Sequence, residues 1–184
     1  EFDQWFINKL PGLLETPEFP MDELRVQWDD LVMRQNKKLA KYASGIGTRM
    51  GTTVVAFLVV DDKYYIMNIG DSRAYMVSDA IYQLTKDQTY VQYEMDLGHL
   101  TWEQAQTHPQ RNVLLQCVGA SEIIIPEFSH GEYKTGEVYM VCSDGFRHVI
   151  AKEEFEKLLE PKKMDTEKAL KDVAVYCTEL NKSR

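Results

Sequence analysis

Two acidic turns, each directly after an apolar run, constrain this chain more than any other part of its sequence. The first is Gly70-Asp71-Ser72-Arg73, and the second, Ser143-Asp144-Gly145, comes later in the chain. The pattern predicts that Asp71 and Asp144 each end a β-strand, on backbone that a sheet holds rigid. Carboxylate oxygens are the ligands that Mg²⁺ and Mn²⁺ prefer. We therefore expect both aspartates in a metal-dependent hydrolase, although Asp and Gly are also ordinary turn residues.

Composition is that of an ordinary soluble globular protein. Hydrophobic residues make up 44% and charged residues 27% of 184 positions, a length that fits one domain spanning residues 1–184. The net charge of −8 and the pI near 5.1 argue against nucleic-acid binding, which normally needs a basic face. Acidity is compatible with a phosphate-processing site, because bound divalent ions reverse the local sign of the potential.

The sequence shows no feature of a membrane or secreted protein. No apolar run approaches the roughly 18 residues that span a bilayer, and no signal peptide is visible. Cys117, Cys142 and Cys177 are isolated among apolar neighbours without metal-ligand spacing, which is typical of core thiols in a reducing compartment. We expect a cytoplasmic protein that binds no membrane.

Periodicity predicts helices at both ends and strands in the middle. Apolar residues recur at helical spacing before Pro11-Gly12, which we expect to end the first helix near Leu10, and again from Asp22 to about Tyr42. An antiparallel fold is favoured, because tight turns join the strand-like segments. The predicted strands are 52–60, 63–69, 73–77, 81–84, 114–118, 123–129 and 137–142, and further helices are predicted at 89–97, from Thr101 to before Pro109, at 152–159 and at 166–180 behind an Asp165 cap.

Five motifs, taken in order, resemble those of the PPM/PP2C family of metal-dependent protein serine/threonine phosphatases, particularly its compact bacterial members. The resemblance runs from about Arg49 to Leu159. It implies an α+β fold in which an antiparallel β-sandwich is flanked by helix pairs, in four layers α-β-β-α. The motifs are Met50-Gly51-Thr52-Thr53, Gly70-Asp71-Ser72-Arg73, Leu84-Thr85-Lys86-Asp87, His108-Pro109-Gln110-Arg111-Asn112 and Cys142-Ser143-Asp144-Gly145.

The resemblance assigns metal-binding roles to the two aspartates. It implies that Asp144 binds a core metal and that Asp71 helps to hold a third, weaker ion, with two or three Mn²⁺ or Mg²⁺ ions in a complete domain. Two other roles for Asp71 stay open: capping backbone amides and pairing with Arg73. Arg73 itself fits either a phosphate clamp or a structural ion pair, and we favour the ion pair because the family takes its phosphate-binding arginine from nearer the N-terminus.

A third candidate is His108, next to Pro109. The segment Gly98 to Asn112 resembles the mobile flap of bacterial family members beside the catalytic cleft, so His108 is expected to contact substrate. Family members usually carry histidine after the Thr-Lys-Asp segment, but Gln88 stands there, which argues against a general-acid role for that position.

The family's first glutamate-bearing strand, its Asp-Gly-Met-Gly-Gly-like turn and its final Asp-Asn turn have no counterpart in this sequence. We therefore expect the chain to be truncated at both ends. The leading hypothesis is the central part of a monomeric phosphatase that hydrolyses phosphoserine and phosphothreonine in proteins, the targets of a bacterial serine/threonine kinase. The main alternative is a phosphatase-like pseudoenzyme that binds or regulates partners, and a haloacid-dehalogenase-type phosphatase is a weaker one, because no Asp-x-Asp nucleophile turn occurs.

Overall fold

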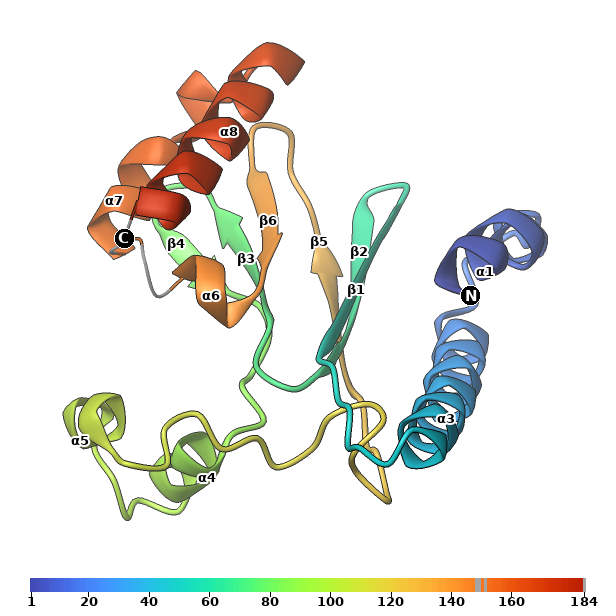
Figure 1. Cartoon of the computed structure of the whole chain (residues 1–184). Coiled ribbons are helices and arrows are strands. Elements are labelled where there is room, and N and C mark those ends of the chain that lie inside the picture. The colour runs from blue at the N-terminus through green and yellow to red at the C-terminus, as the bar shows by residue number, and fades with distance from the viewer. Residues whose placement is uncertain (148–149, 151, 184) are drawn as a thin grey trace.

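A computed structural model describes residues 1–147, 150 and 152–183 and contains two antiparallel sheets that face each other (Figure 1). Helices cover the outer face of each sheet, and a helical insertion lies beyond one end of the strands (Figure 1). The helices are α1 (Phe2–Asn8), α2 (Leu10–Leu14), α3 (Met21–Gly45), α4 (Tyr90–Asp96), α5 (Trp102–Thr107), α6 (Asp144–Arg147), α7 (Lys152–Leu158) and α8 (Glu167–Ser183), with a 3₁₀ turn at Pro161–Lys163. The strands are β1 (Val54–Val60), β2 (Lys63–Ile69), β3 (Arg73–Val77), β4 (Ile81–Gln83), β5 (Glu127–Glu132) and β6 (Val138–Cys142).

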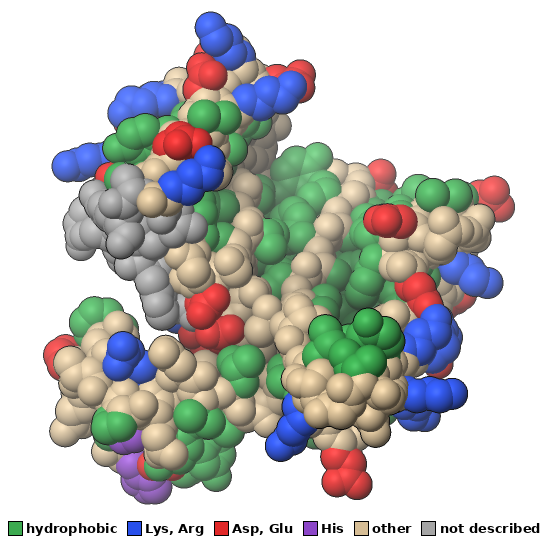
Figure 2. Space-filling model, in the orientation of Figure 1, with side chains coloured by type: hydrophobic (Ala, Val, Ile, Leu, Met, Phe, Trp, Pro, Cys, Tyr) green, Lys and Arg blue, Asp and Glu red, His purple; other side chains and the backbone are tan. Residues whose placement is uncertain are grey.

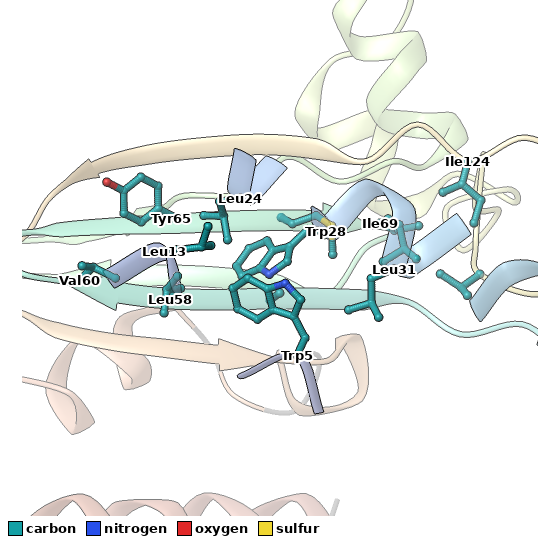
Figure 3. Close-up of a cluster of buried hydrophobic side chains, with 14 residues drawn as sticks. Trp5, Leu13, Leu24, Trp28, Leu31, Leu58, Val60, Tyr65, Ile69 and Ile124 are labelled. Atoms are coloured by element: carbon teal, nitrogen blue, oxygen red, sulfur yellow. The ribbon is translucent and has the colours of Figure 1, made fainter. Parts of the chain in front are cut away.

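The first sheet has the order β1-β2-β5 and packs against the N-terminal helices. β1 and β2 form an antiparallel hairpin with Val54 opposite Ile69, as the sequence predicts, and Asp61 takes a φ of 53° in its turn. The apolar stripe of α3 meets alternate residues of both strands, and Trp28 at its centre is completely buried beside Trp5 (Figure 3). Burial of this stripe explains why a helix with several charged residues folds onto the sheet.

The second sheet has the order β4-β3-β6 and packs against the C-terminal helices. Its core joins Val77 and Ile81 to Phe155 of α7 and Cys177 of α8. In β3 and β6, Arg73 lies opposite Cys142 and Val77 opposite Val138, so the two strands are paired along their full length.

Aromatic side chains join the two sheets across the middle of the molecule. The ring of Tyr139 in β6 lies 5.3 Å from that of Phe57 in β1 and 5.6 Å from that of Tyr64 in β2, measured between centroids. Hydrophobic side chains line the recess between the two halves (Figure 2). The layers are therefore helix, sheet, sheet and helix, which confirms the predicted α+β sandwich.

The first helix ends near Leu10 as predicted, at Asn8, and a separate helix, α2, begins at Leu10 because proline is tolerated in a helix's first turn. Two predictions about strands are wrong. Residues 114–118 form only isolated bridges, Thr89 to Leu114 and Thr52 to Val118, and β5 begins at Glu127 rather than Ile123. Apolar residues give these loops the composition of a strand, but a strand forms only where another strand pairs with it.

Two predictions about helix starts have different outcomes. The capping box at Thr101 is present: its side chain accepts from the Gln104 N–H, and the Gln104 side chain accepts from the Thr101 N–H. At α8 the cap is Thr166 rather than Asp165, since the Thr166 hydroxyl accepts from the Ala169 N–H at 3.1 Å.

None of the described helices has the length and apolar character required to cross a membrane.

Candidate metal centre

The first acidic turn lies where the hairpin of the first sheet passes into the second sheet. Gly70 has a φ of 98°, and a Cβ at this position would lie 2.4 Å from Thr53 Cγ2. Only glycine therefore fits both the left-handed backbone and the close approach to Thr53. Asp71, the next residue, is half-buried, and it is followed by the buried Ser72.

A network of hydrogen bonds holds this turn in place. The Gly70 N–H donates to Gln88 Oε1 at 2.7 Å, and the Gln88 N–H donates to the Gly70 carbonyl at 2.9 Å. Asn68, which is 1% exposed, donates from Nδ2 to the Lys86 carbonyl at 2.9 Å. The hydroxyls of Thr53 and Ser72 lie 2.7 Å apart. The backbone that carries Asp71 is thus fixed from several sides before any ligand binds.

The second acidic turn follows β6, and Asp144 is the first residue of α6. Arg73 opposes Cys142 in the antiparallel β3–β6 pair. Asp71 lies two residues before Arg73, and Asp144 lies two residues after Cys142. Both aspartates therefore lie at the same end of this strand pair. Asp144 is exposed, and its Oδ1 accepts the Gly145 N–H at 2.7 Å.

The end of the second sheet that carries α6 faces the helical insertion (Figure 1). Acidic side chains are exposed between α6 and the α4–α5 insertion (Figure 2). The Asp71 turn, α6 and the insertion lie at the same end of the sandwich (Figure 1).

Arg73 forms the structural ion pair that we favoured, and its partner is Asp87. Its Nε and Nη2 donate to the two carboxylate oxygens at 2.7 and 2.6 Å, and its Nη1 donates to the Tyr75 hydroxyl at 3.0 Å. Burial alone would lower the pKa of Arg73, but the hydrogen bonds and charge of Asp87 raise that pKa above its usual value. The Arg73 guanidinium therefore stays charged and is held in a bidentate ion pair with Asp87.

His108 lies at the C-terminal end of α5, within the insertion. Its ring packs 5.7 Å from that of Tyr90, and its Nδ1 accepts the Gln110 N–H at 3.1 Å. The insertion is closed at its base, where the Tyr90 N–H donates to the Val113 carbonyl at 2.9 Å. These contacts tie His108 to the insertion.

The carboxylates present fit part of a ligand set for a hard cation. Oxygen donors from Asp71 and Asp144 match the preference of Mg²⁺ and Mn²⁺. Throughout the part of the chain that the structure describes, however, no group of three or more His, Cys, Asp or Glu side chains is arranged to hold a metal ion. Grooves of about 440 and 600 Å³ run along α3, and neither is lined by these two aspartates.

Sequence reasoning missed the residues that brace the first turn. Asn68 interrupts the apolar run of β2, and a polar residue inside a buried strand signals a specific hydrogen-bond partner. In the sequence, Gln88 is distinctive only because it stands where family members usually carry histidine. Its contact with Gly70 links segments 18 residues apart, which neither periodicity nor spacing encodes.

Comparison with known proteins agrees with this fold. The protein phosphatase 2C family model matches residues 3–176. The chain is 30% identical over 151 residues to the serine/threonine phosphatase stp of Listeria innocua, and the match covers 80% of this chain and 60% of that protein. The chain thus spans about 60% of the length of this curated relative.

Solved structures give the same result. The structure of the S. agalactiae serine/threonine phosphatase superposes with a TM-score of 0.80 at 27% identity, covering 91% of this chain and 68% of that one. The catalytic domain of the phosphatase PstP, solved in complex with two manganese ions, gives a TM-score of 0.69 at 27% identity, covering 97% of this chain and 72% of that one. From the extent of the family match and the shared fold, this chain belongs to the protein phosphatase 2C family.

Proposed function

We propose that the protein hydrolyses phosphoserine and phosphothreonine esters in proteins, with Mn²⁺ or Mg²⁺ held at the end of the β3–β6 pair. The observation that carries the proposal is the register of these strands, which brings Asp71 and Asp144 to the same end. Family membership supports it, and the PstP neighbour was solved with two manganese ions.

Each aspartate has a distinct place in this proposal. Asp144 is exposed at the end of β6 and would be the direct ligand of a core metal. Asp71 is half-buried on a braced turn and would help to hold a further, weaker ion. Bound divalent ions lower the pKa of a water molecule and neutralise phosphoryl charge. Arg73 is not the phosphate clamp, because Asp87 occupies its guanidinium.

The insertion would govern access of the phosphoprotein. In this proposal residues 98–112 form a flap on a single phosphatase domain, and His108 contacts the substrate rather than taking part in the chemistry. Lids of this kind tune binding and release. Substrates would be targets of a serine/threonine kinase in the cytoplasm, and the phosphatase would act as a monomer.

The proposal is tested with the complete protein that the gene encodes. Asp144→Asn should remove most Mn²⁺-dependent hydrolysis of a phosphothreonine peptide, while Asp71→Asn should mainly raise the Mn²⁺ concentration needed. Circular dichroism checks that both variants are folded. Near wild-type activity in Asp144→Asn would refute the proposed site.

The alternative of a non-catalytic, phosphatase-like regulator predicts a different result in the same assay. The wild-type protein would then bind a phosphopeptide without releasing phosphate at any Mn²⁺ or Mg²⁺ concentration. A His108→Ala variant adds a separate measurement: we expect its Michaelis constant for phosphopeptides to rise while turnover of a small aryl phosphate changes little. Equal loss of turnover on both substrates would place His108 in the chemistry instead.

A further inference from the structure

Gln88 holds the acidic turn of Asp71 from two directions. Its Oε1 accepts the Gly70 N–H at 2.7 Å, and its own N–H donates to the Gly70 carbonyl at 2.9 Å. Both polar backbone groups of the residue before Asp71 are therefore bonded to one residue. We call this pair of hydrogen bonds the Gln88 clamp.

The clamp meets a specific need of the backbone at Gly70. This residue is buried and has a positive φ, and it lies just beyond Ile69, where the pairing of β2 with β1 ends. A buried N–H without an acceptor is costly, and a side chain that supplies one fixes the local geometry. Because Asp71 follows directly, the direction of its carboxylate depends on this geometry.

The same residue forms part of the base of the helical insertion. The Leu115 N–H donates to the Gln88 carbonyl at 2.8 Å, and Gln88 Nε2 donates to the Ile125 carbonyl at 3.4 Å. The next residue, Thr89, caps α4 by accepting the Gln92 N–H at 3.2 Å. Gln88 thus connects the acidic turn to the segments on which the insertion is built.

We propose that Gln88 is a positioning residue for metal binding, which acts by clamping Gly70 so that the Asp71 carboxylate is held ready for a divalent cation. The inference rests on the proposed function, because that function assigns the cation to this turn. To position the turn in this way, the Gln88 side chain must accept a hydrogen bond, and it need not transfer a proton. A side chain of the same length without an acceptor should lose the role, and one with a carboxylate oxygen should keep the clamp.

The test uses ¹H–¹⁵N NMR spectra of the 184-residue chain during a Mn²⁺ titration, in which paramagnetic broadening reports proximity to the ion. The test variant is Gln88→Met, and Gln88→Glu restores an acceptor. The control is Gln116→Met: the Gln116 side chain makes two 2.7 Å hydrogen bonds to the backbone of Ile125 and none to Gly70. Well-dispersed spectra show that each variant is folded. If Gln88→Met is unfolded, Gln88→Asn replaces it, because the asparagine side chain is one methylene too short to reach the Gly70 N–H.

In Gln88→Met we expect hydrogen exchange of the Gly70 amide to become about tenfold faster, the scale of one lost hydrogen bond. The Mn²⁺ concentration that broadens the Asp71 and Ser72 amides should rise several-fold. Gln116→Met should change neither value, and Gln88→Glu should restore the slow exchange of the Gly70 amide. Slow exchange and unchanged broadening in Gln88→Met would overturn the role of Gln88 while leaving the metal site standing. Absence of broadening near Asp71 in the wild-type chain would overturn the metal site itself, and the inference with it.

Discussion

The ion pair between Arg73 and Asp87 should be among the strongest polar interactions that stabilise the second sheet. The Asp87 side chain is 8% exposed and that of Arg73 is 25% exposed, so the pair is largely shielded from water. Replacing Arg73 by methionine removes two charge-assisted hydrogen bonds at 2.7 and 2.6 Å from a carboxylate that stays buried, with Gln83 Nε2 still 3.3 Å from Asp87 Oδ1. Breaking a buried pair by removing one partner costs about 3 to 5 kcal/mol. The partial exposure of Arg73 places the expected loss near the lower limit, about 3 kcal/mol.

Removing both charges should cost much less than removing Arg73 alone. Arg73→Met/Asp87→Leu removes the buried carboxylate together with its cation, so the double variant should lose about 2 kcal/mol less stability than Arg73→Met. The measurement is urea unfolding followed by circular dichroism, with a double-mutant cycle over the four proteins. For a chain of this size, a loss of about 3 kcal/mol corresponds to a fall in melting temperature of roughly 6 to 12 °C.

A matched control comes from the exposed pair of Arg34 and Asp30 on α3, whose side chains are 52% and 63% exposed. Solvent-exposed helical pairs contribute about 0.3 to 0.5 kcal/mol, so a cycle on this pair should give a coupling energy in that range. If the Arg73–Asp87 coupling energy is no larger than that of the control, burial does not strengthen this ion pair.

Two further predictions concern the acidic turn and the C-terminal core. Gly70→Ala should destabilise the protein by at least 2 kcal/mol in urea unfolding, because a left-handed backbone costs about 1 to 3 kcal/mol and the new Cβ would lie 2.4 Å from Thr53 Cγ2. Gly136 also has a positive φ, 93°, but a Cβ there would meet no neighbouring atom, so Gly136→Ala should lose only the conformational part of this stability. Equal losses in the two variants would contradict the steric argument. Burial and, to a smaller extent, the charge of Glu154 raise the pKa of the Cys177 thiol, and this side chain is 2% exposed. At pH 8 Cys177 of the folded protein should therefore react with a thiol reagent far more slowly than in the unfolded chain. Rapid labelling of the folded protein would show that α8 does not pack as described.

The sequence predicts the layered fold well because its main signals are local. The apolar stripe of α3 and the hairpin around Asp61 depend on periodicity and on turn chemistry over a few residues. The same approach fails at residues 114–118, where apolar composition is typical of a strand but the structure shows isolated bridges in place of a strand. Strand formation depends on a partner, and the partner is not encoded locally.

The candidate site is predictable only in part, for the same reason. Asp71 and Asp144 stand out because each follows an apolar run. The partner of Arg73 is Asp87 rather than the nearby Asp71, since β3 turns back through β4 and brings the Thr85 segment alongside. The clamp by Gln88 depends on the same long-range contact. Such hydrogen bonds between distant segments appear only once the chain is folded.

Anomalous X-ray scattering from crystals of this chain grown with Mn²⁺ would show directly where the ion binds. We expect an anomalous peak within coordination distance of an Asp144 carboxylate oxygen, on the side that faces the Asp71 turn, and loss of that peak in Asp144→Asn. Peaks that occur only elsewhere on the molecule, or a peak that persists unchanged in Asp144→Asn, would contradict the proposal that these two turns form part of a metal centre.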